Sequence, residues 1–219
     1  MKKLSTHLKI CGVTQTNQAL EIASLGVHAI GVIGVESSPR FVPLEDRNEI
    51  FKNLLLKYPK VERVLVVANM KDEEIQKNTK SNAYPTVIQL HGNESIEKCR
   101  SLKTIHPEVK WWKALQIKNK ENIENIKKYA DYIDAILLDS WHEKQLGGTG
   151  SRINLDLLEN EKFKSKLWIA GGISPEWIPN LFKIIKPYGI DCSSKVEITP
   201  GIKDINKIKI LINTLNKLI

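Results

Sequence analysis

The sequence has few cysteines and no long hydrophobic run, and each shortage excludes a class of protein. Its three cysteines are Cys11, Cys99 and Cys192, and no two of them form a Cys-x-x-Cys motif. A disulfide framework and a cysteine-based zinc site are therefore not expected. The longest uncharged apolar run covers about seven residues, 29–35, whereas a helix that spans a membrane needs ~20.

The N-terminus lacks the features of a secretory signal. Met1-Lys2-Lys3 is similar to the charged start of a signal peptide, but Ser5, Thr6, His7 and Lys9 interrupt any apolar stretch that would follow. We therefore expect a cytoplasmic protein. The 12 glycines and 9 prolines are too few for a fibrous or low-complexity chain.

Arginine is also scarce, although the chain is basic. The net charge is +8 and the pI is about 9.3, but only five of the 33 cations are arginine, and the lysines are scattered among glutamates. This distribution is typical of a solvated lysine-rich surface and argues against a nucleic-acid partner. A mild positive field would still favour capture of an anionic small molecule.

Short runs rich in valine, isoleucine and leucine recur along the chain, each followed by a longer segment with helical periodicity. Their apolar positions are contiguous, as in parallel strands that are buried on both faces. The predicted strands are Leu8–Cys11, Ala29–Val35, Val61–Val67, Val87–Leu90, Trp111–Leu115, Ala135–Leu138, Leu167–Ala170 and Gly189–Cys192.

The intervening segments are predicted helices with recognisable ends. Thr14 is the expected N-cap of a helix over Gln15–Leu25, which Gly26 terminates, and Asp204 is the expected N-cap of the last helix. Pro175 suits a first helical turn. The other predicted helices are Glu45–Leu55, Lys71–Asn78, Ser95–Ile105, Lys120–Ala130, Leu155–Phe163 and Pro175–Ile185.

Eight strand–helix units in 219 residues average about 27 residues each, and no linker divides the chain. Closure into a barrel accounts for this count, because it removes the sheet edges. We therefore predict an α/β fold, a single (β/α)8 TIM barrel with a parallel eight-stranded sheet that forms one catalytic domain over residues 1–219. The active site should lie at the C-terminal ends of the strands.

Two neighbouring strand ends carry turns suited to phosphate. Gly171-Gly172 follows the seventh strand, and Ser193-Ser194 follows the eighth. Both turns present backbone N–H groups at the pair of loops that commonly hold phosphate in this fold. The alternative is that they are only tight turns.

Cys11 and Asp139 end strands that open on the same mouth of the barrel. A carboxyl group can act as a general acid, and a thiol can act as a base if positive charge lowers its pKa. Cys11 is equally consistent with a small buried apolar residue. In the long loop after Asp139, Gly147-Gly148-Thr149-Gly150 is a candidate lid whose backbone, including Gly148, would close over a ligand.

Two further strand-end residues are candidates for ligand binding. Arg40 could bind a carboxylate through two hydrogen bonds, or it could be an exposed surface arginine. His91 could contact the substrate as a proton shuttle, or it could orient the loop that carries it. Cys99 fits helix packing, and the role of Cys192 stays open.

Several of these segments together resemble phosphoribosylanthranilate isomerase. They occur in that family's order from residue 8 to 204, each at the expected strand end. The matching segments are Lys9-Ile10-Cys11-Gly12-Val13-Thr14, Ser38-Pro39-Arg40-Phe41-Val42, Gln89-Leu90-His91-Gly92, Leu137-Leu138-Asp139 with Gly147-Gly148-Thr149-Gly150, Ala170-Gly171-Gly172-Ile173-Ser174-Pro175, and Asp191 through Glu197 with Pro200-Gly201-Ile202-Lys203-Asp204.

The resemblance implies an activity, the Amadori rearrangement of N-(5′-phosphoribosyl)anthranilate in tryptophan biosynthesis. It implies Asp139 as the general acid, Cys11 as the general base and Arg40 as the partner of the anthranilate carboxylate. Asp191 matches a family position expected to help orient the substrate. The turns at Gly171-Gly172 and Ser193-Ser194 would hold the phosphate.

The resemblance implies no metal and no organic cofactor, and the expected partner is a small phosphoribosyl molecule, with the chain as a monomer or homodimer. One position departs from the family pattern, because Lys195 stands where a glycine is expected. Lysine would strain the turn if a positive φ were required there. Alternatively, its ammonium would contact the phosphate directly.

Two alternative functions are an isomerase that acts on a different substrate and a barrel that has no catalytic activity. The related isomerase of histidine biosynthesis is expected to carry an aspartate where Cys11 stands, so Cys11 argues against it. A non-catalytic barrel that binds nucleic acid or protein would leave Cys11, Asp139 and both phosphate turns without a purpose.

Overall fold

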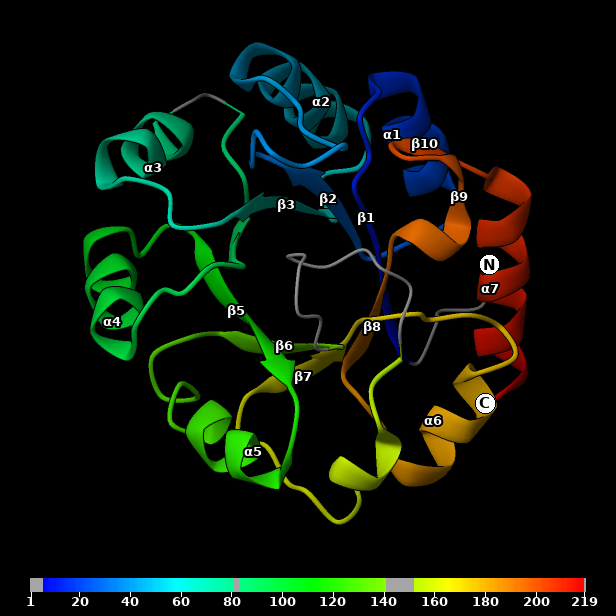
Figure 1. Ribbon diagram of the computed structural model, residues 1–219. Helices are drawn as coiled ribbons and strands as arrows, with labels where there is room; N and C mark the ends of the chain where they lie inside the picture. The colour runs from blue at the N-terminus through cyan, green and yellow to red at the C-terminus, as the bar shows by residue number, and fades with distance from the viewer. Residues whose placement is uncertain (1–5, 81–82, 141–151, 219) are drawn as a thin grey trace.

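The computed structural model describes residues 6–80, 83–140 and 152–218. Eight parallel strands close into a barrel in chain order, and β8 pairs with β1. Figure 1 looks along the barrel axis and shows the helices as a ring around the strands. The predicted (β/α)8 barrel is confirmed; its description as one catalytic domain over residues 1–219 stays a prediction.

The strands lie close to their predicted positions. They are β1 (His7–Cys11), β2 (Ala29–Ile33), β3 (Glu62–Val67), β4 (Val87–Leu90), β5 (Lys110–Ile117), β6 (Ala135–Ser140), β7 (Lys166–Ile169) and β8 (Gly189–Cys192). The helices are α1 (Thr16–Ser24), α2 (Leu44–Lys57), α3 (Asp72–Thr79), α4 (Ile96–Ile105), α5 (Lys120–Lys127), α6 (Ile178–Ile184) and α7 (Ile205–Lys217).

Side chains alternate between the two faces of each strand, so the contiguous apolar runs supply two separate layers. On β1, Leu8 and Ile10 pack in the layer between strands and helices, whereas Cys11 belongs to the cluster inside the barrel. Cys192 on β8 faces the helices, and Cys99 on α4 is fully buried in the same outer layer. Both are therefore packing residues.

The structure corrects three local predictions. The segment Leu155–Phe163 forms only a 3-10 turn over Leu155–Leu157, so no α-helix follows β6 within residues 152–165. Helix α6 begins at Ile178 rather than at Pro175, and Pro179 occupies its first turn. Gln15 is the N-cap of α1, because the Thr14 hydroxyl donates instead to the Gly201 carbonyl at 2.8 Å.

The two other predicted helix ends are confirmed. Asp204 caps α7 by accepting hydrogen bonds from the N–H groups of Asn206 and Lys207. Gly26 follows α1 with φ of +84°, the left-handed conformation that favours glycine after a helix.

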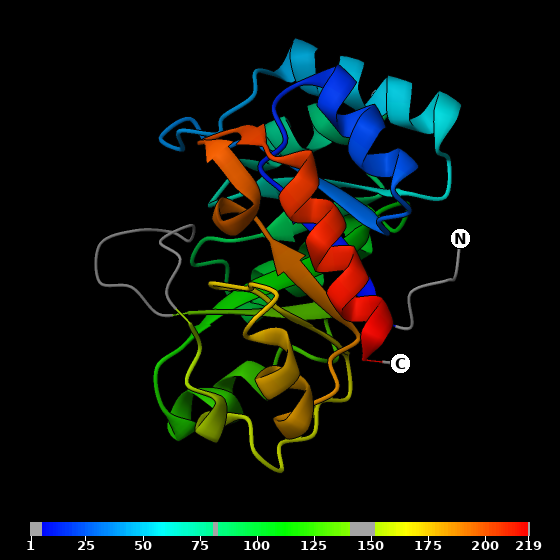
Figure 2. The ribbon, with the colours of Figure 1, turned by 90° about the vertical axis from the view of Figure 1, so that its right-hand side faces the viewer.

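A short hairpin follows β8 and extends the C-terminal end of the barrel. It consists of β9 (Glu197–Thr199) and β10 (Ile202–Lys203), preceded by a 3-10 turn over Ser194–Val196. Figure 2 shows it between β8 and α7. Because Glu197 and Lys203 are register partners across the hairpin, it brings two charged side chains together at the mouth.

None of the helices in the described ranges is both long and apolar enough to cross a membrane. This finding agrees with the absence of long apolar runs in the sequence.

Candidate active site

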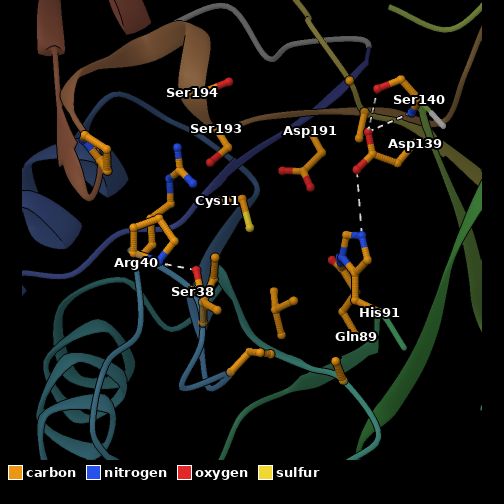
Figure 3. Close-up of a pocket in the computed structure, with 18 of the residues that line it drawn as sticks. Cys11, Ser38, Arg40, Gln89, His91, Asp139, Ser140, Asp191, Ser193 and Ser194 are labelled. Atoms are coloured by element: carbon orange, nitrogen blue, oxygen red, sulfur yellow. Dashed lines mark hydrogen bonds and ion pairs between the residues drawn. The ribbon is translucent and has the colours of Figure 1, made fainter. Parts of the chain in front are cut away.

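A cavity of about 610 Å³ opens at the C-terminal end of the barrel. Every predicted site residue that the structure describes lines it, and Figure 3 shows the polar ones converging on the same space. These residues are Cys11, Arg40, His91, Asp139, Gly171, Gly172, Asp191, Ser193 and Ser194. The predicted lid 147–150, with Gly148, lies outside the described residues.

Asp139 is the penultimate residue of β6 and faces into the cavity while only 5% exposed. Burial raises the pKa of its carboxyl to about 6, against hydrogen bonds from Ser140, whose N–H lies 2.8 Å from Oδ1. A carboxyl group with such a pKa is partly protonated near neutral pH, as a general acid requires.

His91 faces Asp139 across the cavity, with Nε2 3.7 Å from Oδ2 (Figure 3). Burial, followed by the positive charges of Lys9 and Lys113, lowers the pKa of His91 to about 4, so the ring is neutral at pH 7. The Gln89 side-chain amide lies 3.1 Å from Nδ1. When that amide donates to Nδ1, the ring proton resides on Nε2 and points toward the carboxyl of Asp139.

Cys11 ends β1 inside the barrel, between Arg40 and Asp191 in Figure 3. Burial raises the pKa of its thiol, and the ammonium of Lys9 opposes this increase. Lys9 lies two residues earlier on the same face of the strand and forms an ion pair of 2.7 Å with Asp191 Oδ2. Asp191 Oδ1 is buried and has no partner among the described residues, so it can accept a hydrogen bond from a ligand hydroxyl.

Arg40 comes from the loop after β2 and already has a carboxylate partner. Its Nε and Nη2 each donate to one oxygen of Glu197 at 2.8 Å, and Lys203 donates to Glu197 Oε1 at 2.6 Å. Burial alone would raise the pKa of Glu197, but these hydrogen bonds lower it to about 2. In this structure Glu197 therefore forms with Arg40 the two hydrogen bonds that were expected for a ligand carboxylate. A ligand carboxylate must use the remaining edge of the guanidinium.

Gly12 explains how Arg40 crosses the mouth of the barrel. Its φ is +75°, and a β-carbon there would lie 2.5 Å from Cδ of Arg40 and 3.2 Å from Oγ of Ser193. Only glycine combines this conformation with this proximity.

The two predicted phosphate turns line the same side of the cavity. Gly171 and Gly172 have φ of +82° and +59°, and a β-carbon on Gly171 would lie 2.9 Å from Asp139 Oδ1. Ser193 and Ser194 enter the 3-10 turn that contains Lys195. Lys195 is not among the described residues with positive φ, so the strain considered for it is absent, and its exposed side chain lines the cavity.

The sequence alone did not predict the two ion pairs, or the buried glutamine, that lie beneath the cavity. Lys9, Gln89 and Lys203 are each at most 1% exposed. A signal was present, because Lys9 interrupts the apolar run Leu8–Cys11 and a charged residue inside a buried strand needs a partner. The partners, Asp191 and Glu197, are remote in the sequence. No group of His, Cys, Asp and Glu in the described part of the chain is arranged to hold a metal ion.

Comparison with known proteins places the chain that forms this cavity in a family. A family model described as N-(5'phosphoribosyl)anthranilate (PRA) isomerase matches residues 8–214. N-(5'-phosphoribosyl)anthranilate isomerase of Petrotoga mobilis is 40% identical over 215 residues, covering 97% of this chain and 98% of that protein. The protein of that name from Thermosynechococcus vestitus is 39% identical over 208 residues, covering 95% of this chain and 89% of its own.

Solved structures agree with the sequence comparison. The crystal structure of phosphoribosyl anthranilate isomerase from Thermotoga maritima has a TM-score of 0.85 at 30% identity, covering 97% of this chain and 99% of that one. A second, with a TM-score of 0.79 at 30% identity and the same two coverages, is a complex with reduced 1-(o-carboxyphenylamino)-1-deoxyribulose 5-phosphate. A Thermotoga maritima structure with a TM-score of 0.81 at 29% identity, with the same coverages, describes monomers generated from a dimeric isomerase.

Proposed function

The chain belongs to the N-(5'-phosphoribosyl)anthranilate isomerase family, and from this premise we propose that it converts N-(5-phospho-β-D-ribosyl)anthranilate into 1-(2-carboxyphenylamino)-1-deoxy-D-ribulose 5-phosphate. This reaction is a step of tryptophan biosynthesis. The observation that supports it most directly is one cavity lined by both a buried carboxyl of raised pKa, Asp139, and a thiol, Cys11.

In the proposed first step, Asp139 donates its proton to the ring oxygen of the ribose. The bond between C1′ and that oxygen breaks, and the nitrogen lone pair forms a C=N bond. The raised pKa of Asp139 supports this role, since the acid must hold its proton near neutral pH. The neutral His91 at 3.7 Å leaves that carboxyl without a competing cation.

In the second step, the Cys11 thiolate removes the proton from C2′. The electron pair of that C–H bond forms a C1′=C2′ double bond and neutralises the nitrogen. The resulting enol shifts its hydroxyl proton to C1′, which leaves a ketone at C2′ and completes an isomerisation with no net oxidation. Acid–base chemistry suffices, so the proposal requires no cofactor.

Binding is assigned to the remaining residues of the cavity. The free edge of Arg40 would meet the anthranilate carboxylate, and Asp191 Oδ1 would accept from a sugar hydroxyl. The turns at Gly171-Gly172 and Ser193-Ser194 would hold the phosphate, which makes that end of the substrate lie beside Lys195. His91 would contact the ribose beside Asp139. Cytoplasmic location and a monomer or homodimer stay predictions.

The test follows the loss of phosphoribosylanthranilate fluorescence, with the substrate generated in situ. Wild type should turn over, and Cys11→Ala and Asp139→Asn should each lower kcat by at least about 10²-fold. Cys99→Ala is the matched control, because Cys99 is buried on α4 outside the barrel. A folded wild type without turnover contradicts the isomerase proposal. A variant that keeps its rate contradicts only the role given to that residue.

A further inference from the structure

Lys9 is an unusual residue for its position. It points into the barrel from β1 with 0% of its surface exposed, surrounded by strands whose inward side chains are mostly apolar. A buried ammonium is costly unless it is paired, so a lysine here requires a compensating interaction. The roles proposed for Asp139 and Cys11 do not explain why a lysine lies at this position.

Asp191 supplies the pairing partner. Lys9 and Asp191 are register neighbours on β1 and β8, and their charged atoms lie 2.7 Å apart. Burial alone would lower the pKa of Lys9, but Asp191 raises it above its ordinary value. The ammonium therefore keeps its charge inside the barrel.

The same ammonium also lies beside the thiol. Cys11 and Lys9 both reach the space above Gly31, where a β-carbon would lie 2.8 Å from Cys11 Sγ and 3.1 Å from Lys9 Nζ. The ammonium and the thiol therefore lie within a few ångströms of each other, where the positive charge of Lys9 favours the ionised form of Cys11. Gly31 is the register partner of Cys11 on β2, so the absent side chain is what lets the two groups meet.

We propose that Lys9 is a positioning residue for the reaction, whose ammonium, held by Asp191, provides the counter-charge that stabilises the Cys11 thiolate. The inference rests on the proposed function, because it gives the base named there its charged neighbour. Burial raises the pKa of the Cys11 thiol, and without that counter-charge the pKa would rise further, so that less of the thiolate that acts as the base would form.

Other charges face the thiol, and none of them replaces Lys9. Lys203 on β10 also favours the thiolate, but its ammonium is engaged by Glu197 at 2.6 Å. Arg40 from the loop after β2 is bound to the same carboxylate. Asp191 opposes ionisation of Cys11 directly and acts in its favour only by keeping Lys9 charged.

The experiment measures the thiol itself. Cys11 in the full chain is alkylated with iodoacetamide between pH 6 and 10.5, and the modified residue is identified by mass spectrometry. Cys99 and Cys192 are at most 1% exposed, and Cys99→Ala/Cys192→Ala removes them from the background. Lys9→Met should lower the alkylation rate of Cys11 at pH 8 by at least about tenfold, which corresponds to an upward shift of the thiol titration by about one pH unit. The rising limb of kcat/KM against pH should shift with it.

A second variant covers the case in which Lys9→Met fails to fold. Lys9→Met/Asp191→Asn leaves no unpaired charge and should still shift the titration of Cys11 upward, by less than Lys9→Met, because the loss of Asp191 also removes its direct opposition to the thiolate. Its control is Lys113→Met/Glu94→Gln. This variant neutralises another buried pair, Lys113 on β5 and Glu94 in the loop after β4, joined at 2.9 Å, and should leave the titration of Cys11 unchanged. A Cys11 titration that matches wild type in the Lys9 variants, or an equal shift in the control, overturns the inference.

The outcome is separable from that of the proposed function. The shift in alkylation requires no substrate, so it can be found in a protein that fails to turn over phosphoribosylanthranilate. Conversely, an active isomerase whose Cys11 titration ignores Lys9 would retain the function and remove the counter-charge role.

Discussion

At the mouth of the barrel, the fold buries the carboxyl of Asp139 in an environment that disfavours its ionised form. Asp139 is buried without a cation at hydrogen-bond distance among the described residues, and its pKa is raised to about 6. Its ionised form is therefore less stable in the folded chain than in the unfolded one. Such a group trades stability for a proton that is available near neutral pH.

The Asp139 side chain should make the free energy of unfolding fall as the pH rises. Between its ordinary pKa of 3.8 and the folded value of about 6, the folded chain holds a proton that the unfolded chain releases. Asp139→Asn should therefore raise the free energy of unfolding by ~1–3 kcal/mol at pH 7, at 1.36 kcal/mol per pKa unit, and by little at pH 4.

Urea unfolding of wild type and variant at both pH values checks this. Asp156→Asn, on the 3-10 turn after β6, is the control, because Asp156 is exposed to solvent. An equal effect of Asp139→Asn at pH 4 and pH 7 would mean that the charge is not responsible.

The element that most shapes the site is the hairpin of β9 and β10, which the strand–helix alternation did not predict. It carries Glu197 and Lys203, and Glu197 holds Arg40 through two hydrogen bonds. The hairpin thus sets the orientation of an arginine that belongs to the loop after β2, more than 150 residues earlier in the chain.

Removing the Glu197 charge should loosen Arg40. Glu197→Gln leaves a buried cation, Lys203, and a half-buried one, Arg40, with a neutral partner, so the free energy of unfolding at pH 7 should fall by about 3 kcal/mol and KM should rise. Because the folded pKa is about 2, the advantage of wild type is complete above pH 4.5 and is lost as pH falls toward 2.

Denaturant unfolding at pH 7 and pH 3, with steady-state kinetics at pH 7, measures both effects. Glu159→Gln changes an exposed glutamate in the same way and should alter neither quantity. An unchanged KM in Glu197→Gln would show that Arg40 keeps its orientation without this partner.

The 3-10 turn after β8 carries Lys195 at the position where the family pattern has glycine. Since the backbone there is not left-handed and the side chain lines the cavity, a phosphate contact is the alternative that remains. Lys195→Gly should raise KM more than it lowers kcat, and Lys195→Gln should do the same because both remove the charge. A large loss of kcat at constant KM, seen in the same steady-state assay, would contradict a binding role.

At the scale of the whole molecule, the net charge of +8 should aid capture of a phosphorylated, carboxylated substrate. Raising KCl from about 20 to about 300 mM shortens the Debye length below ~10 Å, so kcat/KM should fall several-fold. Sucrose at matched osmolality is the control. A rate that is indifferent to salt would show that local contacts alone attract the substrate.

Much of the architecture was predictable because it depends on local chemistry repeated along the chain. Buried parallel strands require contiguous apolar residues, and all eight were located from that pattern. The Leu155–Phe163 prediction was wrong because helical spacing in a short segment does not ensure an α-helix, and only one 3-10 turn formed. At the site, position relative to the strand ends was sufficient to select the residues that line one cavity.

The sequence by itself determined the barrel, the mouth at which chemistry would occur, and the residue types available there. Tertiary structure alone decided which charges meet: Lys9 with Asp191, and Arg40 with Glu197, pairs separated by 182 and 157 positions. The physical reason is that pKa and orientation depend on burial and on neighbours within a few ångströms. Those neighbours come from strands, a loop and a hairpin that lie far apart in the sequence and that only closure of the barrel brings together.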